Sequence, residues 1–174
     1  MPRKNKKLPR HLLVIRTSAM GDVAMLPHAL RALKEAYPEV KVTVATKSLF
    51  HPFFEGLDVG FLDIETRRTH RGIRGAIRFA REAAELKIDA VADMHNVLRS
   101  KMVRAALHLR GIPVSVIHKG RIEKYMRLGR GSEGVKPLKH TVIRYCDVFR
   151  RLGFDFPDPR PAEKRPRPNP RGEK

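Results

Sequence analysis

Residues 12–22 have the sequence LLVIRTSAMGD, in which a short apolar run is followed by small residues and then by a carboxylate. The apolar run predicts a buried strand, and the small residues predict a turn into a helix. Parallel α/β proteins bind ligands at such places, where the carboxyl end of a strand faces a helix N-terminus. Thr17 and Ser18 are candidate helix caps, and Gly21 allows close approach of another backbone or a substrate. Asp22 has two interpretations: a first-turn acid that complements the helix dipole, or a general base at the floor of a cleft.

The rest of the chain alternates between short apolar segments and amphipathic segments. Strands are expected at residues 11–16, 40–45, 59–64, 88–93 and 113–117, and helices at residues 21–36, 48–55, 74–86, 97–109 and 140–152. This alternation predicts an α/β fold, with a parallel sheet that carries helices on both faces. We expect three parts: a basic N-terminal extension (1–10), one domain (11–155) and a proline-rich basic tail or linker (156–174).

Basic residues far outnumber acidic ones, with 37 Lys and Arg against 18 Asp and Glu and a formal net charge of +19. Such an excess indicates anionic partners, whether nucleic acid, phosphate-bearing sugars or an anionic membrane surface. The single cysteine, Cys146, excludes a disulfide within the chain and suits a reducing cytoplasm. No apolar run is long enough to span a bilayer. We therefore expect a cytoplasmic protein that can contact the inner membrane peripherally.

Three segments resemble glycosyltransferase family 9, which includes the lipopolysaccharide heptosyltransferases. The first is RTSAMGDV at residues 16–23, followed by Leu26-Pro27 and Leu30. The second is DMHNVLRS at residues 93–100, and the third is HTVIRYCDVFRRLG at residues 140–153. The first segment is the most specific, and the order and spacing of all three fit the family.

The resemblance implies a Rossmann-like fold that forms the N-terminal half of a GT-B glycosyltransferase, in which a second domain binds the nucleotide-sugar. The donor domain is expected to be missing from these residues, so that the chain is a fragment or one half of a split enzyme. The resemblance also implies that Asp22 is the catalytic base of an inverting transfer, with Thr17, Ser18, Met20 and Gly21 at the substrate. The expected donor is an ADP-heptose-like nucleotide-sugar, and the expected acceptor is an anionic lipopolysaccharide core.

Two further segments follow expected strands and therefore belong to the same edge of the sheet. Residues 67–71 (RRTHR) are similar in place to the basic cluster with which heptosyltransferases meet acceptor phosphate or Kdo carboxylate groups. A solvated loop is the alternative for this cluster, and a structural hydrogen-bonding role is the alternative for the histidine after the fourth strand. The candidate substrate-binding residues in these segments are Arg67, Arg68, Arg71, His95 and Arg99.

We expect no metal and no cofactor, because the eight His are scattered, the only Cys has no partner at ligand spacing and no Asp-x-Asp occurs. Residues 119–130 combine basic side chains with Tyr125 and Met126, which suits an anionic lipid-linked acceptor, a membrane surface or a solvated loop.

Two other functions compete with glycosyl transfer. The charge favours a basic nucleic-acid-binding module, but no helix-turn-helix, RNA-recognition or zinc-finger signature occurs, and aromatic residues make up only 6%. We therefore expect no nucleic acid as partner. The other alternative is a noncatalytic acceptor-binding remnant or subunit that keeps the fold and needs a partner for donor binding.

Overall fold

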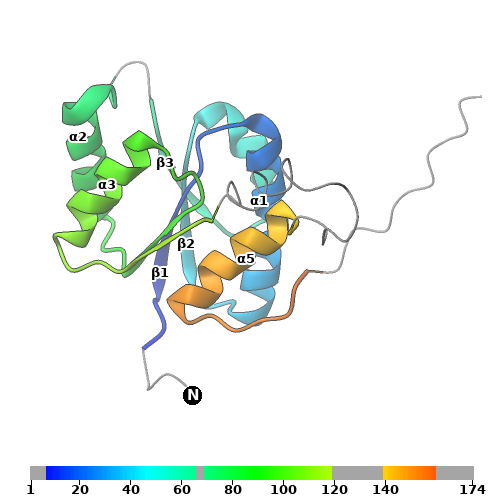
Figure 1. Cartoon of the computed structure of the whole chain (residues 1–174). Helices are drawn as coiled ribbons and strands as arrows, with labels where there is room; N and C mark the ends of the chain where they lie inside the picture. The colour runs from blue at the N-terminus through cyan, green and yellow to red at the C-terminus, as the bar shows by residue number, and fades with distance from the viewer. Residues whose placement is uncertain (1–6, 66–68, 119–138, 160–174) are drawn as a thin grey trace, which may run out of the picture.

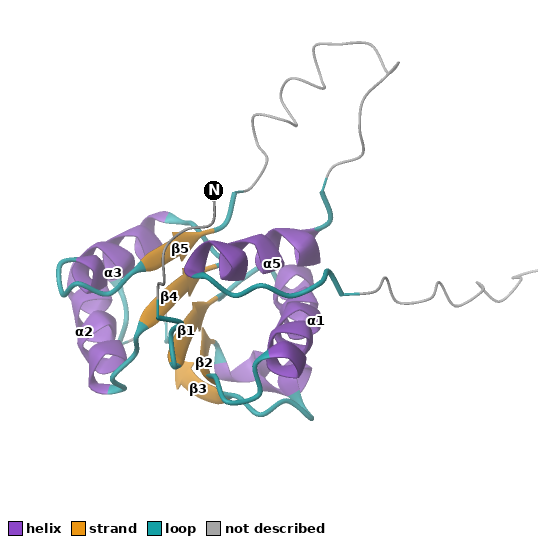
Figure 2. Ribbon diagram, turned by 90° about the horizontal axis from the view of Figure 1, so that it is seen from below, coloured by secondary structure: helices purple, strands orange, loops and turns teal. Residues whose placement is uncertain are grey.

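The computed structural model describes residues 7–65, 69–118 and 139–159, which form one parallel sheet between two layers of helices (Figures 1 and 2). The candidate residues Arg67 and Arg68 and the segment 119–130 lie outside the described residues. In chain order the elements are β1 (His11–Ile15), α1 (Met20–Ala36), β2 (Lys41–Thr46), the 3₁₀ helix η1 (Ser48–Phe54), β3 (Gly60–Asp63), α2 (Gly72–Glu85), β4 (Ala90–Asp93), α3 (Leu98–His108), β5 (Val114–Val116) and α5 (Thr141–Leu152).

The predicted strands and helices are confirmed, with ends that shift by one or two residues. The exception in type is residues 48–55, where the expected short helix is a 3₁₀ helix that contains Pro52. A proline lacks the N–H that an α-helix needs, and short irregular connectors commonly take the tighter 3₁₀ form.

Strand β1 lies in the middle of the sheet and is apolar on both faces. Leu12 and Val14 pack with α1 and α5 on one face, while Leu13 and Ile15 pack with α2 and α3 on the other. All four side chains are at most 2% exposed. Burial on both faces explains why this strand is a continuous apolar run instead of an alternating one.

The strand order is β3-β2-β1-β4-β5, and every neighbouring pair is parallel. The chain runs outward from β1 to β2 and β3, then returns to the other side of β1 for β4 and β5. This is a Rossmann-like order, and its topological switch point lies between β1 and β4. The loops that follow these two strands therefore diverge, and the crevice between them is where open α/β sheets bind ligands.

No helix among the described residues is long and apolar enough to cross a membrane.

Candidate functional site at the carboxyl edge of the sheet

Asp22 lies in the first turn of α1 and is held there by Arg16, the first residue after β1. The Arg16 guanidinium donates hydrogen bonds to the Asp22 carboxylate and to the backbone carbonyl of Met94, which follows β4. The Arg16 side chain is only 7% exposed, whereas the Asp22 side chain is 44% exposed. Arg16 thus holds the carboxylate from the protein interior, and the other side of the carboxylate remains open to solvent.

The prediction that Thr17 or Ser18 caps α1 is wrong. Helix α1 begins at Met20, its N-cap is Ala19, and no side chain caps it. Because Ala19 is the N-cap, the hydroxyls of Thr17 and Ser18 lie before the capping position. Thr17 is buried, and the Ser18 Oγ lies 3.5 Å from the His95 Nε2, across the gap between the loops after β1 and β4.

Met20 and Gly21 are the first two residues of α1 and lie at its exposed N-terminus. The Met20 side chain is 59% exposed. A Cβ at Gly21 would meet no described atom within 4 Å, so no other part of the described backbone approaches this glycine.

The loop after β4 is shaped by Asp93, which is fully buried. Its Oδ1 accepts the backbone N–H groups of His95 at 2.9 Å and Asn96 at 2.8 Å, and its Oδ2 accepts Arg104 Nη1 at 3.3 Å. Asn96 adopts a positive φ of 46°, a conformation that Asn tolerates better than most residues. Asp93 therefore builds the turn that presents His95, and it does not itself face a cleft.

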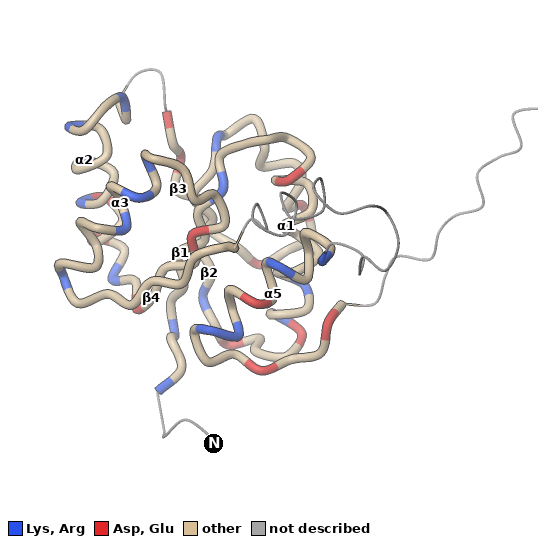
Figure 3. The backbone as a smooth tube through the Cα atoms, in the orientation of Figure 1, with Lys and Arg blue, Asp and Glu red and all other residues tan. Residues whose placement is uncertain are grey.

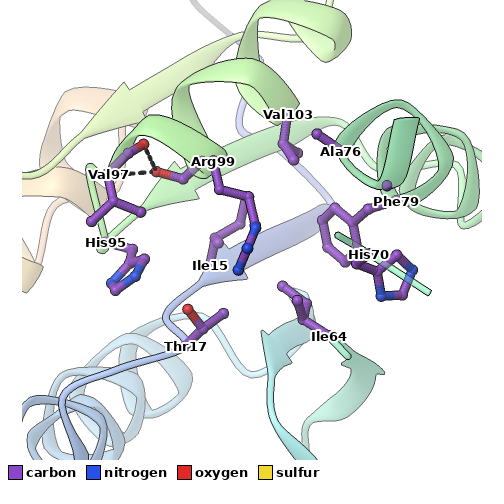
Figure 4. A pocket seen from close by; sticks show the side chains of 12 residues that line it. Ile15, Thr17, Ile64, His70, Ala76, Phe79, His95, Val97, Arg99 and Val103 are labelled. Atoms are coloured by element: carbon purple, nitrogen blue, oxygen red, sulfur yellow. Dashed lines mark hydrogen bonds between the residues drawn. The ribbon is translucent and has the colours of Figure 1, made fainter. Parts of the chain in front are cut away.

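A narrow pocket with a cavity volume of about 30 Å³ opens between the ends of β1, β3 and β4 and the starts of α2 and α3 (Figure 4). This is room for a few water molecules or a small polar group. Three of the predicted site residues, Thr17, His95 and Arg99, line it. Figure 4 shows Arg99 extending into the pocket from α3, between His95 on one side and His70 on the other.

The structure does not bring all of the predicted residues into that pocket. Asp22, Met20 and Gly21 lie on the α1 side of the β1 loop, outside the pocket lining, and Arg71 is exposed at the N-cap of α2. The site therefore has two parts, a carboxylate on one side of the switch point and, on the other, a mostly apolar pocket into which Arg99 extends.

His70 is buried, although its basic neighbours in the sequence had suggested a solvated loop. It is only 5% exposed and packs edge-on against Phe79, with ring centroids 5.5 Å apart. Its Nδ1 accepts the backbone N–H of Glu65 at 3.1 Å, so the ring proton sits on Nε2, which lies 3.0 Å from a Glu82 carboxylate oxygen. His70 thus anchors the loop before α2 onto that helix.

Sequence reasoning missed two residues that support Asp22, namely Arg16 and Tyr145. The Tyr145 hydroxyl donates to the Asp22 backbone carbonyl at 2.9 Å, and the Arg16 guanidinium carbon lies 6.0 Å from the centroid of the Tyr145 ring. Burial raises the pKa of Tyr145 to about 12, so its hydroxyl stays a hydrogen-bond donor at neutral pH. A charged residue directly after a buried strand was a usable signal for Arg16, but nothing local connects residue 145 with residue 22.

Within the described ranges, no three His, Cys, Asp or Glu side chains are grouped as metal ligands would be.

These features define the class: a Rossmann-like parallel α/β domain with a carboxylate and an arginine-containing pocket at its topological switch point. No family model matches the sequence, and no curated protein matches it either.

Solved structures do match the fold. A glycosyl transferase family 9 protein from Veillonella parvula has a TM-score of 0.60 and 17% identity, over 83% of this chain and 42% of that one. Escherichia coli heptosyltransferase WaaC with ADP has a TM-score of 0.55 and 25% identity, over 84% of this chain and 48% of that one. Escherichia coli ADP-heptose lps heptosyltransferase II has a TM-score of 0.53 and 21% identity, over 91% of this chain and 44% of that one.

The resemblance to glycosyltransferase family 9 and its heptosyltransferases is therefore confirmed in the fold. The chain spans less than half the length of these three structures.

Proposed function

We propose that this chain is the acceptor-side domain of a family 9-type glycosyltransferase, with Asp22 as the general base. The observation that carries the proposal is the half-exposed Asp22 carboxylate, which Arg16 holds at the switch point of a heptosyltransferase-like fold. A carboxylate that served only the helix dipole would not need a buried arginine to orient it.

The chemistry follows from the demands of glycosyl transfer. The Asp22 carboxylate accepts the proton of an acceptor hydroxyl while that oxygen attacks the anomeric carbon and the bond to the diphosphate oxygen breaks. A single displacement of this kind inverts the anomeric carbon. The backbone N–H groups of the first turn of α1, at Met20, Gly21 and Asp22, lack partners within the helix and suit phosphate oxygens of the donor.

The proposed donor is a nucleotide-sugar of the ADP-heptose type. Two of the similar structures are Escherichia coli WaaC with ADP and with ADP-2-deoxy-2-fluoro heptose. Since this chain spans at most half the length of those proteins, we place the main donor-binding surface on a second domain outside these 174 residues.

The proposed acceptor is an anionic lipopolysaccharide core, met at the cytoplasmic face of the inner membrane. Arg99 in the pocket and Arg71 at the N-cap of α2 carry the charge that such an acceptor needs, together with Arg67 and Arg68, which shortly precede Arg71 in the sequence. Arginine forks match phosphate and carboxylate oxygens in geometry as well as in charge.

Calorimetry on the 174-residue chain tests this assignment with a phosphorylated core sugar and an ADP-sugar as separate ligands. We expect the core sugar to bind and the ADP-sugar to bind weakly or not at all. Arg99→Gln should weaken core-sugar binding by 1.5–3 kcal/mol, or about ten- to a hundredfold, for each charged hydrogen bond lost. Arg81→Gln, on the exposed face of α2, removes the same charge and should not. Tight ADP-sugar binding without core-sugar binding would contradict the proposal that this chain is the acceptor-binding domain.

A further inference from the structure

A side chain of the last helix contacts the candidate base, although the two residues are far apart in the sequence. Tyr145 on α5 lies 123 residues from Asp22, yet its hydroxyl donates to the Asp22 backbone carbonyl at 2.9 Å. The two helices pack against each other on the same face of the sheet (Figure 2). Tyr145 is fully buried, so both its ring and its hydroxyl have one fixed set of neighbours.

The ring of Tyr145 also meets the partner of the base. The Arg16 guanidinium carbon lies 6.0 Å from the ring centroid, within the range of a cation–π contact. Arg16 is buried and donates both to the Asp22 carboxylate and to the Met94 carbonyl. Tyr145 therefore touches Asp22 at its backbone and Arg16 at its guanidinium, the two points that determine where the carboxylate lies.

We propose that Tyr145 is a positioning residue for Asp22. It fixes the first turn of α1 through its hydroxyl and the plane of the Arg16 guanidinium through its ring, so that the carboxylate keeps one arrangement toward the cleft. The Asp22 side chain is 44% exposed, so its orientation depends on how firmly the buried Arg16 and the backbone of the first turn are held. Functional groups need a second layer of contacts to hold their geometry. This inference rests on the proposed role of Asp22.

Tyr37 provides a matched control for the ordinary role of a packed tyrosine. Its hydroxyl also donates to a backbone carbonyl at 2.9 Å, that of Asp155, and its ring packs edge-on against Phe154 with centroids 5.2 Å apart. Like Tyr145, it ties α1 to the α5 end of the chain, but it does so at the C-cap of α1, away from Asp22. Tyr145→Phe and Tyr37→Phe each remove one hydroxyl and its bond to a backbone carbonyl, and Tyr37→Phe also removes the bond that this hydroxyl accepts from the Asp155 N–H at 2.9 Å.

The test uses the 174-residue chain and nuclear magnetic resonance, with the carbon signal of the Asp22 carboxyl and the Arg16 Nε–H signal as readouts. Both variants should lower the melting temperature slightly. Only Tyr145→Phe should shift the Asp22 carboxyl signal and accelerate hydrogen exchange at the Arg16 Nε–H several-fold. Asp22 and Arg16 signals that stay the same in Tyr145→Phe, or that change equally in Tyr37→Phe, would overturn the proposal.

A second variant covers the case in which Tyr145→Phe does not fold. Arg16→Lys keeps the charge but loses the planar fork that reaches Asp22 and Met94 together and lies over the Tyr145 ring. It should also move the Asp22 carboxyl signal, and an unmoved signal would contradict the network. These readouts need no sugar transfer, so a chain that shows the Tyr145 effect but no core-sugar binding would refute the proposed function and leave the positioning intact.

Discussion

At the scale of single residues, the meaning of Asp22 depends on its surroundings. On helix statistics alone a first-turn acid is an ordinary complement to the dipole. In this fold the same carboxylate is paired with a buried arginine and remains 44% exposed at the edge where parallel sheets bind ligands. The pairing with Arg16 favours the catalytic interpretation.

Asp22→Asn should abolish sugar transfer, measured with the donor-binding domain supplied, while circular dichroism stays unchanged. The amide keeps the shape of the carboxylate and can still accept a hydrogen bond from Arg16, but it cannot take a proton. Loss of a general base costs on the order of a hundredfold to ten-thousandfold in rate. Asp58→Asn is the control, since that carboxylate also pairs with a cation, Lys34, and its side chain is 92% exposed. Normal turnover in Asp22→Asn would contradict the role of Asp22 as general base and leave it only as a first-turn acid that complements the helix dipole.

Gly75→Ala tests the close packing at the start of α2. A Cβ at residue 75 would lie 2.2 Å from the backbone carbonyl carbon of His70, so the loop before the helix would have to move. We expect a loss of about 1–3 kcal/mol in the free energy of unfolding, measured in urea. Gly21→Ala is the comparison, because the added Cβ would meet no atom of the described residues within 4 Å and alanine suits a helix better by about 0.5–1 kcal/mol. Equal effects of the two changes would contradict the contact with His70.

At the scale of elements, neighbouring strands set the chemistry of buried polar groups. His11 begins β1 opposite Lys41 of β2, and its Nε2 lies 2.8 Å from the Thr43 hydroxyl. Burial, and after it the positive charge of Lys41, lowers the pKa of His11 from 6.5. At a pH just below 6.5, His11 therefore binds a proton more readily in the unfolded chain than in the folded protein.

The free energy of unfolding should consequently fall as the pH drops through 6.5. The unfolded state binds the His11 proton first, so the stabilising contribution is present above 6.5 and is lost toward the lower pKa of the folded state. Urea midpoints at about pH 7.5 and pH 5 measure this loss. His11→Gln should reduce it, whereas His108→Asn, at an exposed helix end, should not. The same pH dependence in wild type and His11→Gln would contradict the assignment.

At the scale of the whole molecule, the net charge of +19 requires a distinction between general attraction and a specific site. Lys and Arg recur along α2 and α3, the two helices that border the pocket (Figure 3). Exposed charges of this kind attract any anion, and salt screens that attraction. A specific site binds through hydrogen bonds of fixed geometry and is less sensitive to salt.

Neutralising Arg67 and Arg68 to Gln should weaken binding of the phosphorylated core sugar by about 1.5–3 kcal/mol for each charged hydrogen bond lost. Thermal stability should barely change, because single charged side chains outside buried ion pairs contribute little to folding. Lys6 and Lys7 changed to Gln remove the same charge from the N-terminal extension and control for bulk electrostatics. Calorimetry at low and high salt compares the two pairs. Equal losses that disappear together at high salt would mean that only net charge matters.

Much of the fold was predictable because its determinants are local. Apolar runs such as Leu12–Ile15 and the amphipathic periods between them specify strands and helices within a few turns of chain, and their alternation admits few architectures. The placement of Asp22 at a ligand-binding edge follows from the same local pattern. The cap of α1 was less predictable, since Thr17 and Ser18 are good capping residues, yet Thr17 is buried and Ser18 lies beside His95.

The sequence by itself therefore determined the elements, the parallel sheet and the motif at its carboxyl edge. Only the tertiary structure decided that Arg16 pairs with Asp22, that Tyr145 supports both, and that Ser18 faces His95 across the switch point. The physical reason is that Tyr145 and Ser18 contact segments 123 and 77 residues away, and that Arg16, although near Asp22 in the chain, is also held by a carbonyl 78 residues away. Their proximity depends on the order in which the strands assemble, and no local period carries that order. The burial of His70 has the same origin, because its partner Glu82 is reached only when the preceding loop folds back onto α2.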